Sequence, residues 1–233
     1  MAKGSYNQFC PVAMASEILC TRWTLILLRE LVVGSTRFND LRRGVPRMSP
    51  ALLSKRLKDL ETAGVVKRVA VKSEPGIYEY HLTRSGQGLK AVIEAVGVWG
   101  HRWIETSLSL KNLDVSFLMW DMRRNIDPTP IPKRRCVIQF IYPELPPTLR
   151  NWWLVVEPNK DVDLCSVDPG FNVDLYVISD LRAMTAIWMG LMPLREAISD
   201  GKVTLTGDRQ LGEDIKTWLK LGYFAKECNL VAA

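Results

Sequence analysis

The stretch "MSPALLSKRLKDLETAGVVKRVAV", Met48 to Val71, decides the fold of the first half of the chain. It carries the start and stop signals of a helix. Ser49 can accept hydrogen bonds from free N–H groups, Pro50 suits the first helical position, and Gly64 suits the residue just past the end. The spacing therefore predicts a helix from Pro50 to shortly before Gly64.

The two sides of this helix differ in character when residues are placed at about 100° intervals. One side is apolar and carries Leu52, Leu53, Leu57 and Leu60. The other side is small, polar and basic and carries Ala51, Ser54, Lys55, Lys58 and Thr62. The apolar side is expected to pack on a core, so the basic side faces either solvent or a partner.

A second short helix is expected just before this one, in "STRFNDLRRG" at residues 35–44. Ser35 or Thr36 is expected to cap its start, and Gly44 is expected to end it. Phe38 and Leu41 are expected to point inward. The turn "GVPRM" leads directly from one helix into the next. Two short helices joined by a tight turn, the second with a basic outer face, match a helix-turn-helix.

The flanking segments complete this picture. Upstream, "VAMASEILCTRWTLILLRELVVG" repeats apolar residues at helical spacing and ends at Gly34. The expected buried face of its second half consists of Trp23, Ile26, Leu27 and Leu31. Downstream, "VVKRVAVKSEPGIYEYHLT" has two β-rich runs around a turn with Pro75 and Gly76, which predicts a two-stranded hairpin, the wing.

A long helix is expected after the wing, in "RSGQGLKAVIEAVGVWGHRWIETSL" at residues 84–108. Its apolar stripe consists of Leu89, Ile93, Val96, Trp99 and Trp103. Such a stripe is explained equally well by contact with a partner subunit and by burial within the domain.

The net charge of +6 is unevenly distributed along the 233 residues. Residues 1–110 hold 16 Lys and Arg against 9 Asp and Glu, a net of +7, whereas residues 111–233 hold 15 against 16, a net of −1. A polyanion such as double-stranded DNA is the partner that would use a basic first half.

The basic helix face suits the major groove of B-DNA. There Lys can donate hydrogen bonds to guanine, Ser can donate or accept a hydrogen bond, and the methyl groups of Ala or Thr can pack on the thymine methyl. Neighbouring cations, Lys67 among them, would meet phosphates. Arg56 lies nearer the apolar side of the helix and is expected either to brace the fold or to reach a phosphate. Glu74 at the wing tip is expected to repel phosphate. The predicted DNA-binding residues are Arg37, Arg42, Arg43, Arg47, Ser49, Pro50, Ala51, Ser54, Lys55, Lys58, Arg68 and Lys72.

The second half has a different pattern, and the domain boundary is placed near residues 108–114. After an expected helix in "DVSFLMWDMRRNID" come four β-rich runs, "RRCVIQFIY", "NWWLVVEP", "DVDLCSV" and "FNVDLYVIS". Two helical segments broken before Pro193, a strand "KVTLTG" and a last helix "DRQLGEDIKTWLKLGYF" follow. The fold class is therefore α+β: a winged helix-turn-helix at 1–110, mainly α with a β-hairpin wing, and an α+β domain at 115–233.

Several function classes find little support in the composition. The five cysteines are odd in number and widely spaced, only His81 and His101 are histidines, and common nucleotide-binding and hydrolase motifs are missing. We therefore expect no enzyme activity, no metal and no cofactor. No run approaches the roughly 20 apolar residues that cross a bilayer, so a cytoplasmic, nucleoid-associated protein without a membrane partner is expected.

The first 105 residues also resemble the HxlR-type bacterial winged-helix regulators. The resemblance rests on "CPVA" at 10–13, "RWTLILLREL" at 22–31, "RFNDL" at 37–41, "MSPALLSKRLKDLETAGVVKR" at 48–68 and "YHLTRSGQGL" at 80–89. It implies a transcriptional regulator that binds a palindromic operator as a homodimer, with the terminal helices of the domain as the interface. "CTRW" at 20–23 departs from the Gly-Lys-Trp usual in the family.

The second half more weakly resembles sterol-carrier-protein-like domains through "VDLYVISDLRAMTAIWMG", "LREAISDGKVTLTGD" and the final helix. Such domains have a mixed sheet and helices around an apolar cavity. The resemblance implies either a sensor for a small apolar ligand or an assembly module. Candidate lining residues are Trp120, Trp188, Met189 and Met192, for which plain core is the alternative.

Three further hypotheses stay open at this point. Cys10 could sense oxidants or electrophiles, as some family members do with a cysteine in a comparable position, or be an unreactive thiol. The winged helix could serve protein contacts without DNA. An enzyme built on the second domain would need a buried carboxylate, but Asp163, Asp174 and Asp180 are expected to be exposed.

Overall fold

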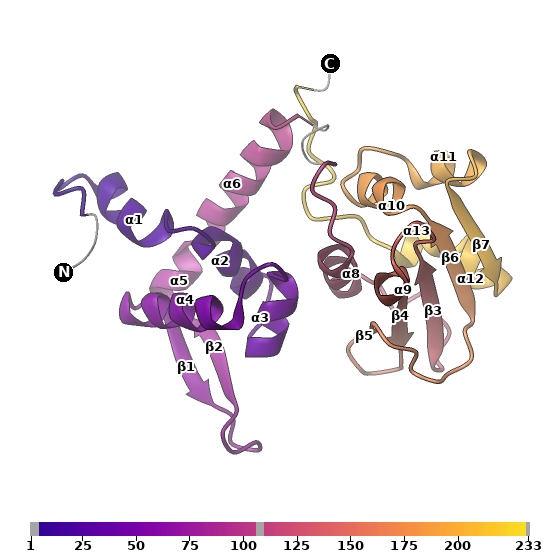
Figure 1. Ribbon diagram of the computed structural model, residues 1–233, viewed down its shortest axis with the longest axis horizontal. Helices are drawn as coiled ribbons and strands as arrows, with labels where there is room; N and C mark the ends of the chain where they lie inside the picture. Colours follow the sequence, from indigo (N-terminus) through magenta and orange to yellow (C-terminus); the bar gives the residue numbers. More distant parts are fainter. Residues whose placement is uncertain (1–4, 106–109, 232–233) are drawn as a thin grey trace. The chain divides into compact units, whose positions relative to one another are not determined.

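The structure of the protein, a computed structural model, describes residues 5–105 and 110–231. The chain forms two compact units, Met1–Gly97 and Val98–Ala233 (Figure 1). The expected domain boundary near 108–114 begins among residues 106–109, which lie outside the described residues.

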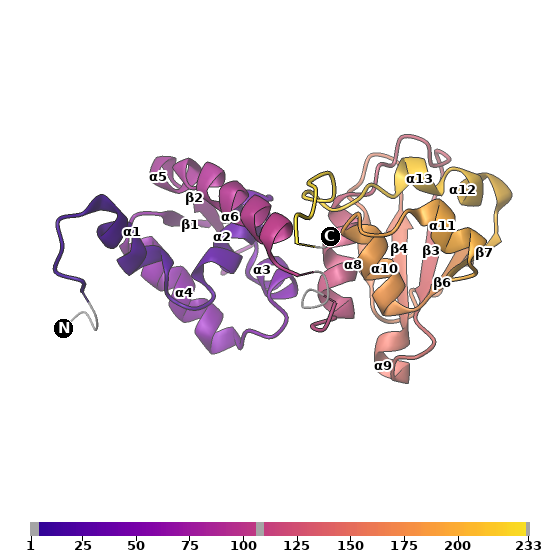
Figure 2. The same ribbon diagram turned by 90° about the horizontal axis from the view of Figure 1, so that it is seen from above.

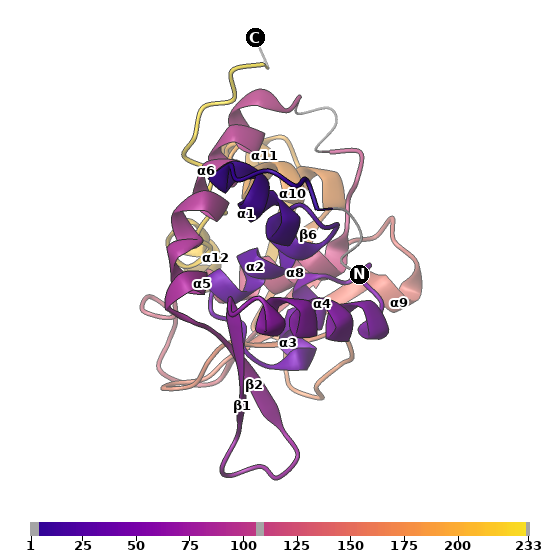
Figure 3. The same ribbon diagram turned by 90° about the vertical axis from the view of Figure 1, so that its left-hand side faces the viewer.

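The first unit is a winged helix-turn-helix. Its elements are α1 (Pro11–Leu19), α2 (Thr24–Val32), α3 (Phe38–Gly44), α4 (Pro50–Thr62), β1 (Val66–Ala70), β2 (Tyr78–Leu82), α5 (Arg84–Gly88) and the first part of α6 (Lys90–Trp103). β1 and β2 are antiparallel, with Val66 opposite Leu82 and Ala70 opposite Tyr78. Figure 3 shows this hairpin, the predicted wing, extending beyond the helices that pack at its base.

The core of this unit joins the helices to the base of the wing. Its buried residues are Leu27, Leu28, Leu31, Leu41, Val45, Met48, Leu53, Leu57, Leu60, Val65, Val66 and Ile93. These side chains come from α2, α3, α4, β1, α6 and the turns between them, so burial of their apolar surface fixes α3 and α4 against one scaffold.

Three expectations for the first unit were wrong in detail. The upstream helical segment is two helices, because the chain breaks at residues 20–23 and Trp23 adopts a left-handed φ of 78°. Ile26 is 42% exposed rather than buried, because it lies on the side of α2 opposite the buried Leu27, Leu28 and Leu31. The residue before α3 is Arg37, which makes no capping bond with its side chain, so neither Ser35 nor Thr36 caps this helix.

The second unit contains a five-stranded mixed sheet with helices. Its elements beyond α6 are α8 (Val115–Arg124), β3 (Cys136–Ile141), α9 (Pro147–Arg150), β4 (Asn151–Val156), β5 (Asp163–Cys165), β6 (Leu175–Ser179), α10 (Leu181–Trp188), α11 (Leu194–Ser199), β7 (Val203–Gly207), α12 (Arg209–Glu213) and α13 (Ile215–Trp218). The strand order is β5-β4-β3-β6-β7, in which β3 and β6 are parallel and the other pairs antiparallel. The α+β class expected for this half is confirmed.

Alternate residues of the central strands face opposite sides of the sheet. Ile138 and Phe140 of β3 join the large core with α8 and α10, which contact each other and lie side by side in Figure 2. Val137 of β3 instead packs with Trp153 and Val155 in a small cluster on the opposite face. The expected last helix is two short helices, because the helical path breaks at Asp214.

A C-terminal segment of the second unit completes the end of α6. The side-chain amide of Asn229 donates to the carbonyl oxygens of His101, at 2.9 Å, and Ile104, at 3.1 Å. The backbone N–H of Leu230 donates to the carbonyl of Arg102 at 2.8 Å. Because the last carbonyls of a helix have no partner within it, these bonds act as a cap supplied from far along the chain.

Among the described residues, no single helix is both long enough and apolar enough to cross a membrane, although α1 and α2, bent by 85°, pass that test as a pair.

Candidate nucleic-acid interface

The helix α4 is fixed by the signals read from its sequence. The hydroxyl of Ser49 accepts a hydrogen bond from the N–H of Leu52 at 3.3 Å, and Pro50 is the first helical residue. Gly64 has a φ of +70°, a conformation that favours glycine after a helix. The apolar side is buried as expected at Leu53, Leu57 and Leu60, whereas Leu52 is half-buried.

The opposite side of α4 is open. Ala51, Ser54, Lys55, Lys58 and Thr62 are all exposed. Within the residues that the structure describes, neither Lys55 nor Lys58 has an ion pair, so both ammonium groups are available to an outside anion. The two sides predicted from periodicity are therefore present as predicted.

A buried carboxylate holds the turn between α3 and α4 in place. The side chain of Glu30 on α2 is fully buried and accepts from Arg29 at 2.8 Å and from the hydroxyl of Ser35 at 3.4 Å. Arg29 also donates to the carbonyl of Gly44 at 2.9 Å. A buried charge is tolerated when it is paired and hydrogen-bonded, as Glu30 is.

Gly44 is required by this arrangement. A Cβ at this position would lie 2.0 Å from two atoms of the Glu30 carboxylate. The glycine that ends α3 thus also makes room for the carboxylate behind the turn. Sequence reading identified Gly44 as a stop but missed Glu30, because a glutamate within a helical pattern is normally a surface residue.

Arg56 braces α4 against the break between α1 and α2. Its Nε donates to the carbonyl of Arg22 at 3.2 Å, and its guanidinium pairs with Asp59 at 2.7 Å. The side chain is 16% exposed. Of the two roles expected for Arg56, the structure supports bracing.

Further cations flank α4 on neighbouring elements. Arg42 and Arg43 occupy the last turn of α3, and Arg43 pairs with Asp40 at 3.4 Å. On the wing, the guanidinium of Arg68 lies 3.8 Å from the centre of the Tyr78 ring, an arrangement that orients the charge. All twelve predicted DNA-binding residues are exposed, and they lie on α3, α4, the turns beside them and the wing.

Arg37 is engaged by two carboxylates. Its guanidinium donates to Glu74 at the wing tip at 2.5 and 3.1 Å and lies 3.6 Å from Glu79 on β2. Hydrogen bonding by Arg37 lowers the pKa of Glu74 and keeps it ionised. The expected repulsion of phosphate by Glu74 is therefore offset by Arg37.

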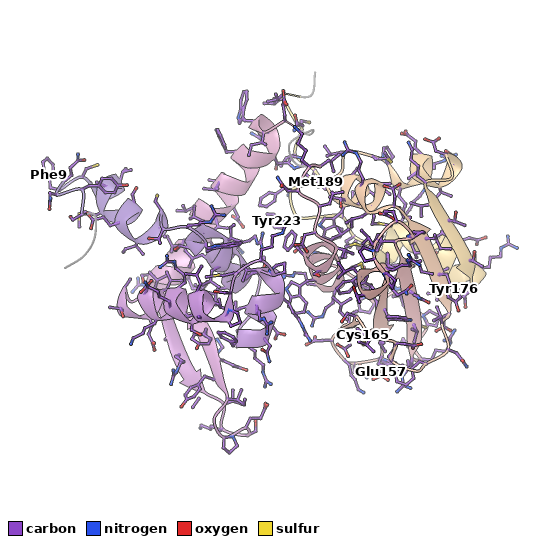
Figure 4. The ribbon with its side chains drawn as sticks, in the orientation of Figure 1. Phe9, Glu157, Cys165, Tyr176, Met189 and Tyr223 are labelled. Carbon is purple, nitrogen blue, oxygen red and sulfur yellow. The ribbon has the colours of Figure 1, made fainter. Side chains whose placement is uncertain are left out.

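The candidate ligand residues of the second unit lie in or near its core. Trp120 is buried beneath the guanidinium of Arg123, which is 4.5 Å from the ring centre. Trp188 is buried, and its Nε1 donates to Asp121 at 3.1 Å. Met189 and Met192 are half-buried, and Figure 4 labels Met189 at the end of α10.

Two of the three carboxylates considered for an enzyme have structural roles. Asp180 caps α10 by accepting from Ala183 at 2.7 Å, and Asp163 is exposed. The side chain of Asp174 is 19% exposed, which corrects the expectation that it is exposed. It pairs with Arg134 at 2.6 Å and accepts from the N–H of Val137.

The five cysteines are free thiols, and Cys10 is half-buried at the start of α1. Among the described residues, no group of three His, Cys, Asp or Glu side chains could hold a metal ion.

Comparison with known proteins matches residues 18–108 to the family described as HxlR-like helix-turn-helix. The HTH-type transcriptional regulator YvaP of Bacillus subtilis is 36% identical over 102 residues, which cover 43% of this chain and 94% of that relative. YdeP of the same organism, also named as an HTH-type transcriptional regulator, is 36% identical over 94 residues, or 40% of this chain and 73% of that relative.

Among solved structures, the reduced form of the redox regulator HypR matches 39% of this chain and 90% of its own, with 31% identity and a TM-score of 0.37. The sequence matches cover the unit that carries α3, α4 and the wing. The chain therefore belongs, through this unit, to the HxlR-like helix-turn-helix family of transcriptional regulators.

Proposed function

We propose that the protein regulates transcription by binding a palindromic DNA operator as a homodimer. One observation carries this proposal: the exposed side of α4 presents Ser54, Lys55 and Lys58, whose two lysines pair with no acidic group in the part of the chain that the structure describes, on a helix whose other side is buried. In this proposal α4 enters the major groove and uses these side chains to contact base edges.

The surrounding cations would contact the phosphate backbone. Arg42, Arg43 and Arg47 precede α4, and Arg68 and Lys72 follow it on the wing, so positive charge flanks the helix at both ends. Phosphate contacts supply affinity and position, whereas the α4 side chains supply the choice of sequence. Arg37 would contribute less because Glu74 and Glu79 already neutralise it.

An exposed apolar stripe on α6 supports a dimer. Val92, Val96, Trp99 and Trp103 recur at helical spacing and are 42, 48, 61 and 52% exposed. Large exposed apolar patches are uncommon on monomers, and tryptophan is enriched at interfaces. The sequence predicted a stripe of Leu89, Ile93, Val96, Trp99 and Trp103. Ile93 is buried in the core and Leu89 is half-buried against it, so only the C-terminal part of that stripe is exposed and favours contact with a partner subunit.

The start of the chain supports the same conclusion. Phe9 is 98% exposed and Val12 72%, and Figure 4 shows the Phe9 side chain at the outer tip of the segment before α1. We infer that α1 and α6 together form the interface. A two-fold dimer would place its two α4 helices about 34 to 36 Å apart, one turn of DNA.

For the second unit we propose an effector-binding role on a sterol-carrier-like fold. Its mixed five-stranded sheet with a helix-covered core fits that description. Its net charge near zero adds nothing to phosphate attraction, so its contribution lies in regulation or assembly.

The test is fluorescence anisotropy of the full chain with labelled genomic fragments at a fixed salt concentration, combined with light scattering. A dimer that binds some fragments at least about 10³-fold more tightly than others supports the proposal. A strict monomer that binds palindromic DNA tightly would rule out the dimer. Equal weak binding to every fragment would instead favour a winged helix used for protein contacts.

A further inference from the structure

A cavity of about 420 Å³ lies in the second unit at the β7 edge of the sheet. It is bordered by β6, β7 and the helices α11, α12 and α13, which lie near one another in Figure 1. Its apolar floor is formed by Leu175 and Ile215, which are buried, and by Ile198 and Leu205, which are half-buried. None of the four ligand residues predicted from the sequence lines it.

The rim of this cavity is charged. Its ionisable lining residues are Arg195, Asp208, Arg209, Glu213 and Lys216. Arg209 and Glu213 neutralise each other in an ion pair of 2.8 Å.

The remaining acidic residue at the rim is also engaged. Asp208 accepts from the N–H of Leu211 at 3.0 Å and lies 3.7 Å from the guanidinium of Arg134. Within the described residues, Arg195 and Lys216 have no recorded hydrogen bond or ion pair. Two cations thus stand unneutralised beside an apolar floor.

A single unpaired cation on the surface is normally hydrated by water and does not by itself indicate a ligand site. Here two of them, from different helices, border one concave site whose floor is hydrocarbon, and the neighbouring charges are already satisfied. An apolar pocket with a few convergent polar groups is the usual form of a small-molecule site, and about 420 Å³ lies toward the small end of such sites.

We propose that this cavity binds a free amphipathic monocarboxylate, with its carboxylate at Arg195 and Lys216 and its hydrocarbon portion on Leu175 and Leu205. This site specifies the ligand class for the effector role proposed above, and a regulatory effect of the ligand rests on that proposed function. It changes the expected ligand class from apolar to anionic and amphipathic.

Gly212 offers a way to fill the cavity without disturbing the fold. A Cβ added there would contact Leu175 at 3.8 Å and Leu205 at 3.9 Å, which are ordinary contact distances. Because Gly212 lies within α12 and lines the cavity, Gly212→Leu would place its side chain over the floor.

The probes are octanoate, 1-octanol and octylamine, which share a chain and differ in head group. In calorimetric titrations of the full protein we expect octanoate to bind at least tenfold more tightly than 1-octanol, and octylamine to bind more weakly still. Arg195→Gln and Lys216→Gln should each weaken octanoate binding at least threefold, and Gly212→Leu should abolish it. Lys133→Gln, which removes an exposed cation elsewhere in the unit, should change nothing.

Three results would overturn the site. They are equal binding of octanoate and 1-octanol, octanoate binding that survives Gly212→Leu in protein with unchanged thermal stability, and no octanoate binding at millimolar concentration. Binding to anionic phospholipid vesicles without binding of free octanoate would also overturn it, in favour of a membrane contact.

DNA affinity measured with and without octanoate separates this inference from the proposed function. Octanoate binding that leaves DNA affinity unchanged supports the cavity site and contradicts the effector role. Octanoate binding by a protein that binds no DNA supports the site and contradicts the proposed regulator.

Discussion

The guanidinium of Arg37 and the carboxylate of Glu74 meet across 37 positions of sequence and tie the tip of the wing to the start of α3. Glu79 reinforces this contact from β2, where its backbone also forms a bridge with that of Arg37. The position of the wing is thereby coupled to the helix-turn-helix, and one arginine that would otherwise face phosphate is held by carboxylates.

Glu74→Gln should free Arg37 for DNA. We expect tighter binding to all sequences alike and a slope of log affinity against log salt that is steeper by about 1, because one more cation contacts phosphate. Glu61→Gln is the matched control, since it removes an exposed carboxylate of α4 that has no recorded partner in the described part of the chain. Identical slopes for the two variants, measured by anisotropy over a salt series, would contradict the release of Arg37.

The contact should also depend on pH. Arg37 lowers the pKa of Glu74 below its ordinary value of 4.5, so the pair stabilises the folded arrangement above that pH. The stabilisation is lost as pH falls through the lowered pKa and Glu74 becomes neutral. Carboxyl NMR titration should give a Glu74 pKa that returns toward 4.5 in Arg37→Gln; an unchanged value would show that Arg37 is not the cause.

Lys55→Ala should weaken binding to the preferred operator by about 1 to 3 kcal/mol and relax preference at one base position, as expected for a base contact. Lys72→Ala should instead weaken all sequences by a similar factor and reduce the salt slope by about 1. Both are measured by anisotropy on a set of operator variants, with Lys133→Ala as the control. If Lys55→Ala retains both affinity and preference, α4 does not read the major groove.

Gly44→Ala should destabilise the first unit by about 2 to 4 kcal/mol, because the new methyl group would collide with the fully buried carboxylate of Glu30. Gly88→Ala is a suitable comparison, since nothing lies within 4 Å of its added Cβ and alanine favours helix by up to about 1 kcal/mol. Urea unfolding followed by circular dichroism checks both. Equal stability of the two variants would mean that Glu30 moves aside at little cost.

Trp99→Asp should convert the dimer to a monomer, since an exposed tryptophan at the centre of an interface commonly contributes 2 kcal/mol or more. Operator affinity should fall at least about tenfold while the folded monomer persists. Val167→Asp introduces the same charge at an exposed apolar residue outside the stripe, 77% exposed against 61% for Trp99, and it should leave the dimer intact. Light scattering that still finds a dimer for Trp99→Asp would exclude this stripe as the interface.

The sequence predicted the elements whose signals are local. Ser49, Pro50 and Gly64 determine α4 through backbone conformation and capping alone, and the turn around Pro75 and Gly76 places the wing. The β-rich runs between turn signals located β3, β4 and β6 in the same way. Each of these depends on residues only a few positions apart.

Features that depend on distant partners could not be read in advance. The left-handed conformation of Trp23 was not predicted, because the helical pattern runs through it and only the unusual "CTRW" at 20–23 marked this position. The burial of Glu30 depends on Gly44 and Ser35, and the neutralisation of Arg37 depends on Glu74. For Trp120 and Trp188 the sequence offered both a ligand-lining role and plain core, and the structure places both in or beside the core, while the cavity is lined by other residues.

The cap on α6 has a consequence for the order in which the chain assembles on the ribosome. Asn229 follows the carbonyl that it binds on His101 by 128 positions, and Glu227 follows its partner Arg102 by 125. The winged-helix unit can fold as soon as it emerges, as N-terminal domains generally do. The final turn of α6, which carries Trp103, therefore gains the capping bonds of Asn229 only after residue 229 has been synthesised.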